Sequence, residues 1–311
     1  MRAVPETIIN SNLRWVPAWA LYTLGLLALI FIWIRGKFQS YSRPRVFNVN
    51  DIERSISYDL EVLQRYKRYL DLYSNSDTFF DGASVLELGP GADLGIGLAL
   101  KQEKVESYTA FDVNPLAFSS PFKLYSDLGA SLNYKEGMVT KFYNDLFGEG
   151  KVDLEGSTFE YIVDSEFRFE SLGDRRFDVV LSNAAFEHFD NVTAVVSDCF
   201  RILKGGGVFL ADVDLQTHTR WLRDNDPLNI YRYSTLLWTA LSVPGSPNRV
   251  LVEQYKTILT EAGFVDIEVF PRIVLDEKSV QSVNGYLSKE FRDSDLRIID
   301  FIIAARKATC S

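Results

Sequence analysis

Hydrophobic and polar residues follow three patterns along the 311-residue chain. Residues 15–34 carry no charge, and a helix of this length, at about 1.5 Å per residue, would span about 30 Å, the thickness of the hydrocarbon core of a bilayer. Residues 52–73 have apolar side chains at helical spacing. From residue 84 onward, short apolar runs stop at glycines or polar residues, as buried parallel strands do. The pattern therefore predicts an apolar helix, an amphipathic helix and an α/β domain.

These patterns divide the chain into four segments. We expect an N-terminal tail over residues 1–14, a transmembrane anchor over 15–34, a helical juxtamembrane connector over 35–80 and the α/β domain over 81–311. The amphipathic helix of the connector either packs on the edge of the domain, which is the favoured interpretation, or lies on anionic lipid. Residues 116–158 form a long connection that is expected to add helices on the substrate side.

A glycine-rich turn follows the first predicted strand of the domain. The strand of residues 84–88 stops at Gly89, and Gly91 comes two residues later. Neither glycine has a Cβ, so the chain can turn sharply and a ligand can lie against bare backbone. Residues 96–100 are apolar and should form the first turns of a helix whose free amide groups face that ligand. The segment therefore predicts a ligand-binding turn between a strand and a helix.

Acidic residues on both sides of this turn indicate the kind of ligand. The next strand ends in Asp112, whose carboxylate can accept two hydrogen bonds from the vicinal hydroxyls of a ribose. A dinucleotide site has the spacing Gly-x-Gly-x-x-Gly, whereas this spacing is one residue longer. Glu87, two residues before the first glycine, would repel a pyrophosphate but suits a ligand with an ammonium and a sulfonium group.

With these features the segment resembles motif I of the class I S-adenosylmethionine-dependent methyltransferases. The resemblance implies that S-adenosylmethionine is the cofactor. It assigns cofactor contacts to Glu87, Gly89 and Gly91, and to Asp112 as the ribose-binding acid with Val113 beside it.

The resemblance extends over roughly residues 82–307 and implies a fold. Members of the family have a doubly wound, mostly parallel, seven-stranded sheet flanked by helices. Residues 266–274 are then expected to form a strand, and residues 295–307 the last strand, antiparallel and at the sheet edge. The predicted fold class is therefore α/β, a Rossmann-like methyltransferase fold preceded by a transmembrane helix.

Further cofactor contacts follow in the order of that family. A strand ends at Asn183, and the pair Glu187-His188 follows it. The resemblance implies that Asn183 and His188 contact the cofactor, and that Asp164, at the end of a shorter strand, lies near the adenine amino group. The alternative roles are structural: Asn183 as a cap of its strand, and Glu87 as a cap of backbone amides at the turn.

Two acids end the next strand along the chain. Residues 195–203 have helical spacing, and residues 204–207, a lysine and three glycines, are expected to end that helix with a glycine cap. Residues 208–215 then form a strand that finishes in Asp212 and Asp214. Both acids should lie at the ligand-binding edge of the sheet.

The chain has only two histidines, His188 and His218, and both follow predicted strands at that edge. We expect His218 to act as a general base, oriented by Asp212 or Asp214, and we predict no metal. The alternative is a loop histidine with satisfied hydrogen bonds. This region resembles methyltransferases of bacterial glycan and polysaccharide assembly clusters, but Thr217 stands where those proteins have an aspartate.

Aromatic and charged residues flank the apolar helix as they do in membrane anchors. Trp15, Trp19 and Trp33 suit the interfacial belts of a bilayer. A cleaved signal peptide is the alternative, but no small-x-small site follows residue 34. More cations follow the span than precede it, so the catalytic domain is expected on the cytoplasmic side. The cations are Arg2 and Arg14 before the span, and Arg35, Lys37, Arg43 and Arg45 after it.

Composition limits the partners. The first 45 residues hold six basic residues and one acid, which leaves 27 basic and 41 acidic residues in the rest of the chain. Such an acidic domain is a poor partner for nucleic acid. Two cysteines give no disulfide framework.

The sequence therefore predicts a membrane-anchored enzyme. The favoured reaction is O-methylation of a glycan or lipid-linked sugar at the cytoplasmic membrane face. One alternative is methylation of a quinone or another membrane lipid. Another is a cofactor-binding scaffold without catalysis that serves a membrane assembly.

Overall fold

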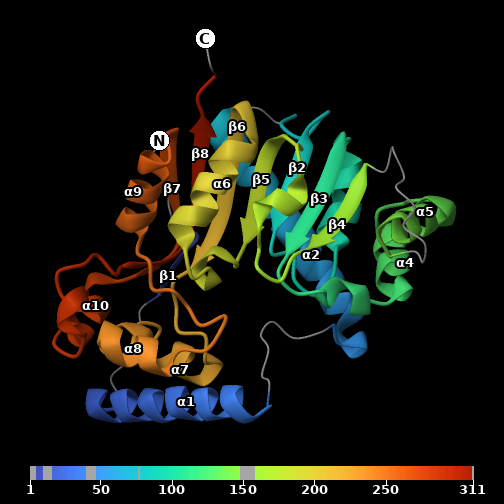
Figure 1. Cartoon of the computed structure of the whole chain (residues 1–311). Helices are drawn as coiled ribbons and strands as arrows, with labels where there is room; N and C mark the ends of the chain where they lie inside the picture. Colours follow the sequence, from blue (N-terminus) through green and yellow to red (C-terminus); the bar gives the residue numbers. More distant parts are fainter. Residues whose placement is uncertain (1–4, 10–15, 40–46, 76–77, 148–157, 310–311) are drawn as a thin grey trace.

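A computed structural model describes the chain except for residues 1–4, 10–15, 40–46, 76–77, 148–157 and 310–311 (Figure 1). Its centre is a single sheet of eight strands. The strands are β1 Thr7–Ile9, β2 Ser84–Leu88, β3 Ser107–Asp112, β4 Phe159–Val163, β5 Phe177–Asn183, β6 Leu203–Asp214, β7 Phe264–Leu275 and β8 Ile298–Lys307.

The strand order is β1-β7-β8-β6-β5-β2-β3-β4, which confirms a doubly wound α/β sheet. Strand β8 is antiparallel to both of its neighbours, β6 and β7, and the other pairs are parallel. The sequence predicts seven strands, and β1 is the additional one. The expectation that the last strand lies at the sheet edge is wrong. Residues 299–305 of β8 are all buried, and a strand with both faces apolar is stable inside a sheet rather than at its edge.

The chain order of the strands reverses at β2, which lies between β3 and β5. Ligands of open α/β sheets bind at the carboxyl ends of the strands at such a switch point. In Figure 1 the parallel strands point downward, so this edge faces the lower part of the molecule, where α1, α7 and α8 lie. These helices are Ala18–Gln39, Arg220–Asn225 and Thr235–Leu241.

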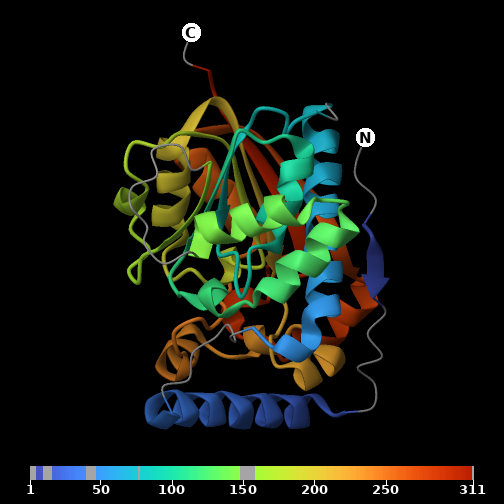
Figure 2. The same cartoon turned by 90° about the vertical axis from the view of Figure 1, so that its right-hand side faces the viewer.

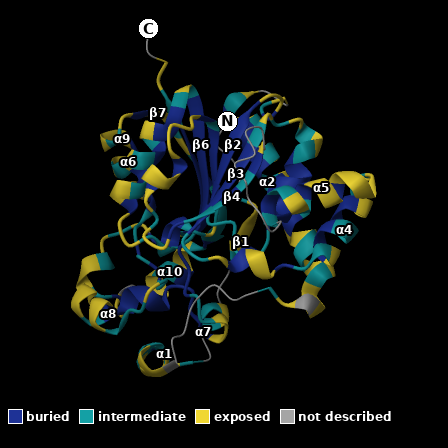
Figure 3. Cartoon of the chain, turned by 45° about the vertical axis from the view of Figure 1, so that its right-hand side comes forward, coloured by how far each residue is buried: buried dark blue, intermediate teal, exposed yellow. Residues whose placement is uncertain are grey.

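Helices cover both faces of the sheet and leave the strands buried in the middle (Figure 3). One apolar core joins the sheet to α2 through α5, and a second joins the other face to α6 and α9. The bounds are α2 Ile52–Ser74, α3 Gly95–Leu100, α4 Phe122–Ser131, α5 Glu136–Phe147, α6 Val192–Ile202 and α9 Val252–Glu261.

The amphipathic helix of the connector is α2, and it packs on the domain. Val62, Tyr66 and Leu70 on its inner face are completely buried in the first core. The interpretation that this helix packs on protein is therefore confirmed. The connection after β3 forms α4 and α5, as expected, but these helices pack beside α3 and β4 rather than at the carboxyl ends of the strands. Tyr125 and Phe142 are buried there, so these aromatic residues belong to the core.

The glycine run after α6 does not cap that helix as predicted. Helix α6 ends at Ile202, and Leu203, already extended, begins β6 and pairs with Phe177 of β5. Leu203 is buried, so packing draws the chain directly from the helix into the sheet. The glycines lie inside the first part of β6.

A third apolar core lies below the carboxyl ends of the strands, and we call the elements around it the cap. They are α7, α8, the short 3-10 helix η7 at Asn229–Arg232 and α10 at Glu277–Asn284. Their core includes Tyr231, Trp238 and Leu287. Figures 1 and 2 both show α1 lying across the outer side of the cap, and Tyr22 and Leu29 of α1 pack against this core.

Helix α1 is long and apolar enough to cross a membrane, judged by length and composition. The predicted start at Trp15 lies outside the described residues, as do Arg2, Arg14, Arg43, Arg45 and Cys310. The segment in front of α1 contributes β1, which pairs with β7 of the same sheet that α2 covers. Both sides of α1 are therefore built into one domain.

Candidate active site

The glycine turn after β2 leaves bare backbone next to a carboxylate. Gly89 has φ +67° and Gly91 has φ +85°, a region that side chains rarely allow. Among the described residues, a Cβ at Gly91 would meet no atom within 4 Å, so this backbone faces open space, whereas one at Gly89 would lie 2.7 Å from the Cβ of Ala185. Gly91 N donates to Asp112 Oδ2 at 3.3 Å. The turn thus brings Gly89, Gly91 and Asp112 together, as the sequence predicts.

Asp112 is fixed at the end of β3 by its own loop. Its Oδ1 accepts a hydrogen bond from Asn114 N at 2.9 Å, and the residue is 6% exposed. Burial raises the pKa of this carboxyl, while the backbone amides of Asn114, Gly91 and Val113 lower it. Val113 follows at the surface of the turn and is half-buried. The carboxylate is therefore rigid and close to the open backbone of Gly91.

Four acids surround the turn: Glu87, Asp59, Asp93 and Asp112. Burial, together with the charges of Asp93 and Asp112, raises the pKa of Glu87 to about 7. The hydroxyl of Tyr108, which donates to Glu87 Oε2 at 2.5 Å, lowers this pKa in part. Burial and the neighbouring Asp93 also raise the pKa of Asp59. Acids that repel one another in a buried place are stabilised by a cation. The site therefore fits a positively charged ligand and not a pyrophosphate.

Asp164 lies at the end of β4, but its carboxylate is engaged by its own loop. It accepts hydrogen bonds from Ser171 Oγ at 2.5 Å, Glu166 N at 2.9 Å and Arg168 Nε at 3.1 Å. These bonds, that of Ser171 first, lower its pKa to about 2. Both oxygens are thus used in holding the loop, and contact with an adenine stays a prediction.

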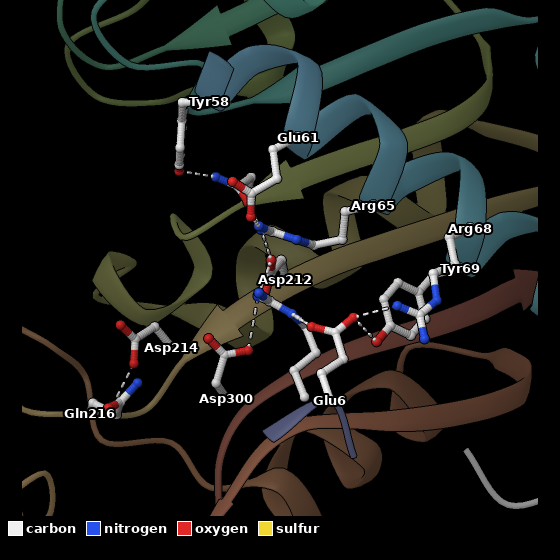
Figure 4. A network of polar contacts seen from close by, with 12 residues as sticks. Glu6, Tyr58, Glu61, Arg65, Arg68, Tyr69, Asp212, Asp214, Gln216 and Asp300 are labelled. Carbon is white, nitrogen blue, oxygen red and sulfur yellow. Dashed lines mark hydrogen bonds and ion pairs between the residues drawn. The ribbon is translucent and has the colours of Figure 1, made fainter. Parts of the chain in front are cut away.

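Asn183 and Asp212 meet a cation that the sequence does not predict (Figure 4). Arg65 of α2 donates through Nη1 to Asn183 Oδ1 at 3.1 Å and to Asp212 Oδ2 at 2.7 Å. Arg272 of β7 donates to both carboxylate oxygens of Asp212, at 2.9 and 2.7 Å. The side chain of Asp300 joins this group through Arg272 at 3.0 Å. Asp212 therefore ties α2 and β7 to the end of β6 and is neutralised by two guanidinium groups.

The two histidines lie side by side. The ring centroids of His188 and His218 are 4.7 Å apart, with the rings nearly perpendicular. His188 Nδ1 lies 2.7 Å from the carbonyl of Gly245, and His218 Nδ1 lies 3.0 Å from the carbonyl of Gln216. A carbonyl oxygen can only accept a hydrogen bond, so each ring carries its hydrogen on Nδ1, and Nε2 is the basic nitrogen of the ring. The arrangement suits a group that accepts a proton.

The acid nearest to His218 is Glu187, which the sequence presents only as part of the Glu-His pair. His218 Nε2 lies 3.9 Å from Glu187 Oε1. Glu187 is 1% exposed, and neither of its carboxylate oxygens has a hydrogen-bond partner among the residues that the structure describes. Burial, with the charges of Asp214 and Asp212, raises the pKa of Glu187 well above its usual range. A buried carboxyl of this kind gains stability when its neighbour becomes a cation.

Asp214 supports His218 through hydrogen bonds of the loop backbone. Its Oδ1 accepts Gln216 N at 2.9 Å, and the carbonyl of Gln216 is the partner of His218 Nδ1. Of the two acids predicted to orient the histidine, Asp212 pairs with arginines and Asp214 holds the loop that carries His218, while Glu187 lies beside the ring. The reason is that β6 ends at Asp214 and the chain turns before it reaches His218.

The same cluster could hold a divalent metal ion. One ligand atom from each of Glu187, His188 and His218 lies within 4.8 Å of the others. Histidines that bind metals through Nε2 commonly donate Nδ1–H to a carbonyl, as both do here. The sequence predicts a general base at this place and no metal. Removal of divalent metal ions distinguishes a cluster that acts as a base from one that binds a metal.

A narrow cavity lies between the histidines and α1. Its lining includes Gly25, Leu29 and Ile32 of α1 together with His218 and Trp238 of the cap. The cavity is about 40 Å³, which holds a few water molecules at most. The wall of the pocket on this side is therefore largely apolar and belongs partly to the N-terminal helix.

The predicted residues gather in two groups. Glu87, Gly89, Gly91 and Asp112 surround the turn after β2, whereas the second group lies at the ends of β5 and β6. Arg65 and Arg272 had no signal in the sequence, because they come from α2 and β7 and meet the site only through folding. The second group contains Asn183, His188, Asp212, Asp214 and His218.

Comparison with known proteins agrees with this geometry. The family described as "Methyltransferase domain" matches residues 58–269, whereas no curated protein matches the chain. Among solved structures, the CurJ carbon methyltransferase is 15% identical, with a TM-score of 0.46 over 93% of this chain and 67% of its own.

Two further solved structures are similar at the same level. Phosphoethanolamine N-methyltransferase 2 of Haemonchus contortus is 17% identical, with a TM-score of 0.43, and 77% of this chain matches 51% of that enzyme. A putative methyltransferase of Bacillus halodurans is 18% identical, with a TM-score of 0.39 over 81% of this chain and 100% of its own. The family match covers more than half of the chain, and the chain belongs to the S-adenosylmethionine-dependent methyltransferases.

Proposed function

We propose that this methyltransferase methylates a hydroxyl of a glycan or lipid-linked sugar at the cytoplasmic face of a membrane. The observation that carries the proposal is His218, whose Nδ1 is engaged by a carbonyl while its Nε2 lies by a buried carboxyl and next to an apolar cavity. A sugar hydroxyl needs a base of this kind to lose its proton. The cellular source of the cofactor supports the cytoplasmic side.

The turn after β2 would hold S-adenosylmethionine. Asp112 would accept the ribose hydroxyls, the open backbone at Gly91 would lie against the ligand, and the acids around Glu87 would balance its positive charge. The bound cofactor supplies an electrophilic methyl group on a sulfonium. Asn183 and His188, at the end of β5 and just after it, are proposed as further contacts, and Asp164 as a contact to the adenine.

The residues of the second group would prepare the acceptor. Nε2 of His218 would take the proton of the hydroxyl, and the carboxyl of Glu187, whose Oε1 lies 3.9 Å from that nitrogen, would then accept a hydrogen bond from the imidazolium. Asp214 keeps the ring in place through the Gln216 backbone. Holding the acceptor oxygen in line and excluding water supplies the rest of the rate enhancement.

Two other functions remain as alternatives. Methylation of a quinone or another membrane lipid is favoured by the apolar wall that α1 gives to the cavity. A scaffold that binds the cofactor without turnover would keep the turn after β2 but would not need His218.

A labelled-methyl assay separates these functions. The full chain is incubated with methyl-labelled S-adenosylmethionine and a membrane extract, and the label is followed into saccharide, quinone and other lipid fractions. Label in a saccharide supports the proposal, label in a quinone or other lipid supports the first alternative, and binding of the cofactor with no transfer supports the scaffold. His218→Asn serves as the control, because transfer through this base should then be lost.

A further inference from the structure

The segment in front of α1 is fastened to the catalytic domain by charged contacts (Figure 4). The carboxylate of Glu6 accepts hydrogen bonds from Arg68 Nη1 at 2.9 Å and from the hydroxyl of Tyr69 at 2.9 Å. Its other oxygen pairs with Arg272 Nε at 3.3 Å. The pairing of β1 with β7 adds backbone hydrogen bonds directly after Glu6. The N-terminal flank of α1 therefore belongs to the domain.

The segment after α1 enters the same domain. Asn48 Oδ1 accepts Asn50 N at 3.1 Å and starts the turn that leads into α2. Phe47 packs against the first core, and α2 is buried along its inner face. Both flanks of α1 are thus on one side of any membrane that the helix meets.

A transmembrane α1 conflicts with this arrangement. If the helix crossed the bilayer, one end would lie about 30 Å from the domain. The nine steps from Ile9 to Ala18 reach roughly 30 Å when fully extended, so this stretch would have to return through the hydrocarbon as bare, extended backbone. Backbone groups without hydrogen bonds are not tolerated there. Crossing would therefore require β1 to leave the sheet and Glu6 to lose its partners.

The inner face of α1 is docked on the cap by specific contacts. Asn229 Nδ2 donates to the carbonyl of Leu21 at 3.1 Å, and the hydroxyl of Tyr233 donates to the carbonyl of Tyr22 at 2.9 Å. A Cβ at Gly25 would collide with the Asn229 side chain and the Tyr233 hydroxyl. Contacts this close fix the helix in one orientation along the cap.

The outer face of α1 carries a continuous apolar stripe. Its members recur at intervals of three to five residues, and Phe31 is 65% and Phe38 81% exposed. Cations, Arg35 and Lys37, lie at the C-terminal end of the helix, where the ammonium of Lys37 sits 4.3 Å from the ring centroid of Trp33. An apolar stripe of this size marks a surface that another apolar phase covers. The stripe consists of Trp19, Leu24, Leu27, Phe31, Ile34 and Phe38.

We propose that α1 lies in the plane of the membrane surface, with this stripe immersed among the acyl chains of an anionic bilayer and the catalytic domain resting on the cytoplasmic side. The stripe, the tryptophans at the interface and the cations next to them are those of an interfacial helix. An apolar helix that keeps its polar contacts on the protein side needs no charged face of its own. The occupant of the stripe is therefore lipid, and the attachment is monotopic.

The same placement defines the acceptor, an inference that rests on the proposed methyltransferase function. Gly25, Leu29 and Ile32 of α1 line the cavity that also contains His218. A molecule that moves from the bilayer along α1 reaches the histidines with its polar end first. The acceptor is accordingly an amphiphile, with the methylated hydroxyl on its headgroup and an apolar chain that separates α1 from α8 as it enters.

Accessibility of the two flanks tests the placement of α1. Single cysteines at Thr7→Cys and Asn50→Cys, in a Cys310→Ser background, are labelled with an impermeant maleimide in sealed inverted and right-side-out membrane vesicles. Both are exposed in β1 and before α2, and Cys199 is buried. The in-plane helix predicts labelling of both sites from the cytoplasmic side alone. Labelling of Thr7→Cys and Asn50→Cys from opposite sides would overturn the proposal.

Flotation with vesicles of phosphatidylcholine and phosphatidylglycerol tests the occupant. The vesicle-bound fraction of the full-length double variant Leu27→Glu/Phe31→Glu should fall at least tenfold. Leu72 is an exposed leucine near the far end of α2, and the control variant Leu72→Glu should float like the natural chain. Retained flotation of the double variant contradicts a lipid occupant. So does a natural chain that binds no vesicles and forms a stable dimer that the double variant abolishes. Binding of S-adenosylmethionine, measured on each variant, verifies the fold.

Extraction tests the acceptor. After reaction on membrane extract, label in the organic phase of a chloroform–methanol partition supports an amphiphile. Label confined to the aqueous phase overturns this part while leaving the transferase function intact. No label in either phase, from protein that binds S-adenosylmethionine, counts against the proposed function itself, so the two failures are distinguishable.

Discussion

The cofactor side and the acceptor side of this protein are built in different ways. The turn after β2 and the carboxylate after β3 come from residues 84–114, so one short stretch of chain makes the cradle. The acceptor side combines α1, the loop after β6 and the cap, which lie far apart along the chain. Local backbone chemistry defines the first region, and long-range packing defines the second. Changes on the two sides should therefore affect different measurements.

The largest effect is expected on the acceptor side, at His218. His218→Ala removes the proposed base, and loss of general-base catalysis typically costs about 10²–10⁴ in rate. Methyl transfer measured with labelled cofactor should fall accordingly, while cofactor affinity measured by calorimetry should not change. Treatment of the natural chain with EDTA should leave the rate unchanged. Loss of activity on EDTA treatment, restored by a divalent metal, would instead assign Glu187, His188 and His218 to a metal.

The cap contains a buried ion pair whose loss should destabilise the acceptor side. Arg232 Nε donates to Asp226 Oδ2 at 2.5 Å, and the two side chains are 1% and 0% exposed. Asp226→Ala leaves the guanidinium buried without its anion, which typically costs about 3–5 kcal/mol. Asp295→Ala removes the anion of an exposed pair with Arg297 and should cost less than about 1 kcal/mol. Denaturant unfolding compares them, and equal effects would contradict the account.

Asp112 is the corresponding test on the cofactor side. Asp112→Ala should weaken S-adenosylmethionine binding by a factor of ten or more, because two charge-assisted hydrogen bonds are worth about 1.5–3 kcal/mol each. Calorimetric titration of the full chain measures the effect. Asp164→Ala, titrated in the same way, tests the proposed contact to the adenine, since its carboxylate is also engaged by its own loop. Unchanged affinity in Asp112→Ala would remove the ribose contact from the account.

Gly25 tests how tightly α1 is docked. Gly25→Ala forces apart α1 and the buried Asn229, and overpacking of this kind typically costs about 1–3 kcal/mol. Gly137→Ala in α5 is the matched control, because a Cβ there meets no atom within 4 Å in the part of the chain that the structure describes, and alanine favours the helix. Thermal unfolding should show a loss for the first and no loss for the second. A stable Gly25→Ala variant would indicate that α1 does not rest on the cap.

The smallest effect is a pH dependence on the cofactor side. The pKa of Glu87 is about 7 in the folded chain, above the value of 4.5 for an exposed glutamate. The folded state therefore binds the extra proton, and its stability without cofactor falls as pH rises from about 5 to about 7. Ionised Glu87 attracts the positive cofactor, so affinity should rise over pH 6–8. Glu87→Gln should flatten this rise, and an unchanged slope in that variant would contradict the role of Glu87.

The sequence predicts the cofactor side of the molecule better than the acceptor side. Gly89, Gly91 and Asp112 are close along the chain, so their spacing alone indicates the cradle. The arginines at Asp212 and the placement of β8 inside the sheet depend on pairings between distant segments. The sequence shows Glu187 only as the neighbour of His188. Its raised pKa comes from burial in the folded chain, which the motif does not indicate. The sequence shows that α1 is long and apolar, but it does not show how the helix is oriented relative to the domain. The contacts of β1 and Glu6 reveal that orientation only in the folded chain.

A parallel titration of the full chain with S-adenosylmethionine and with NAD asks whether the acid-lined turn after β2 receives an adenosyl sulfonium. We expect saturable binding of S-adenosylmethionine in the micromolar range and no measurable binding of NAD. Binding of NAD with equal or higher affinity, or no binding of S-adenosylmethionine by folded protein, would contradict it.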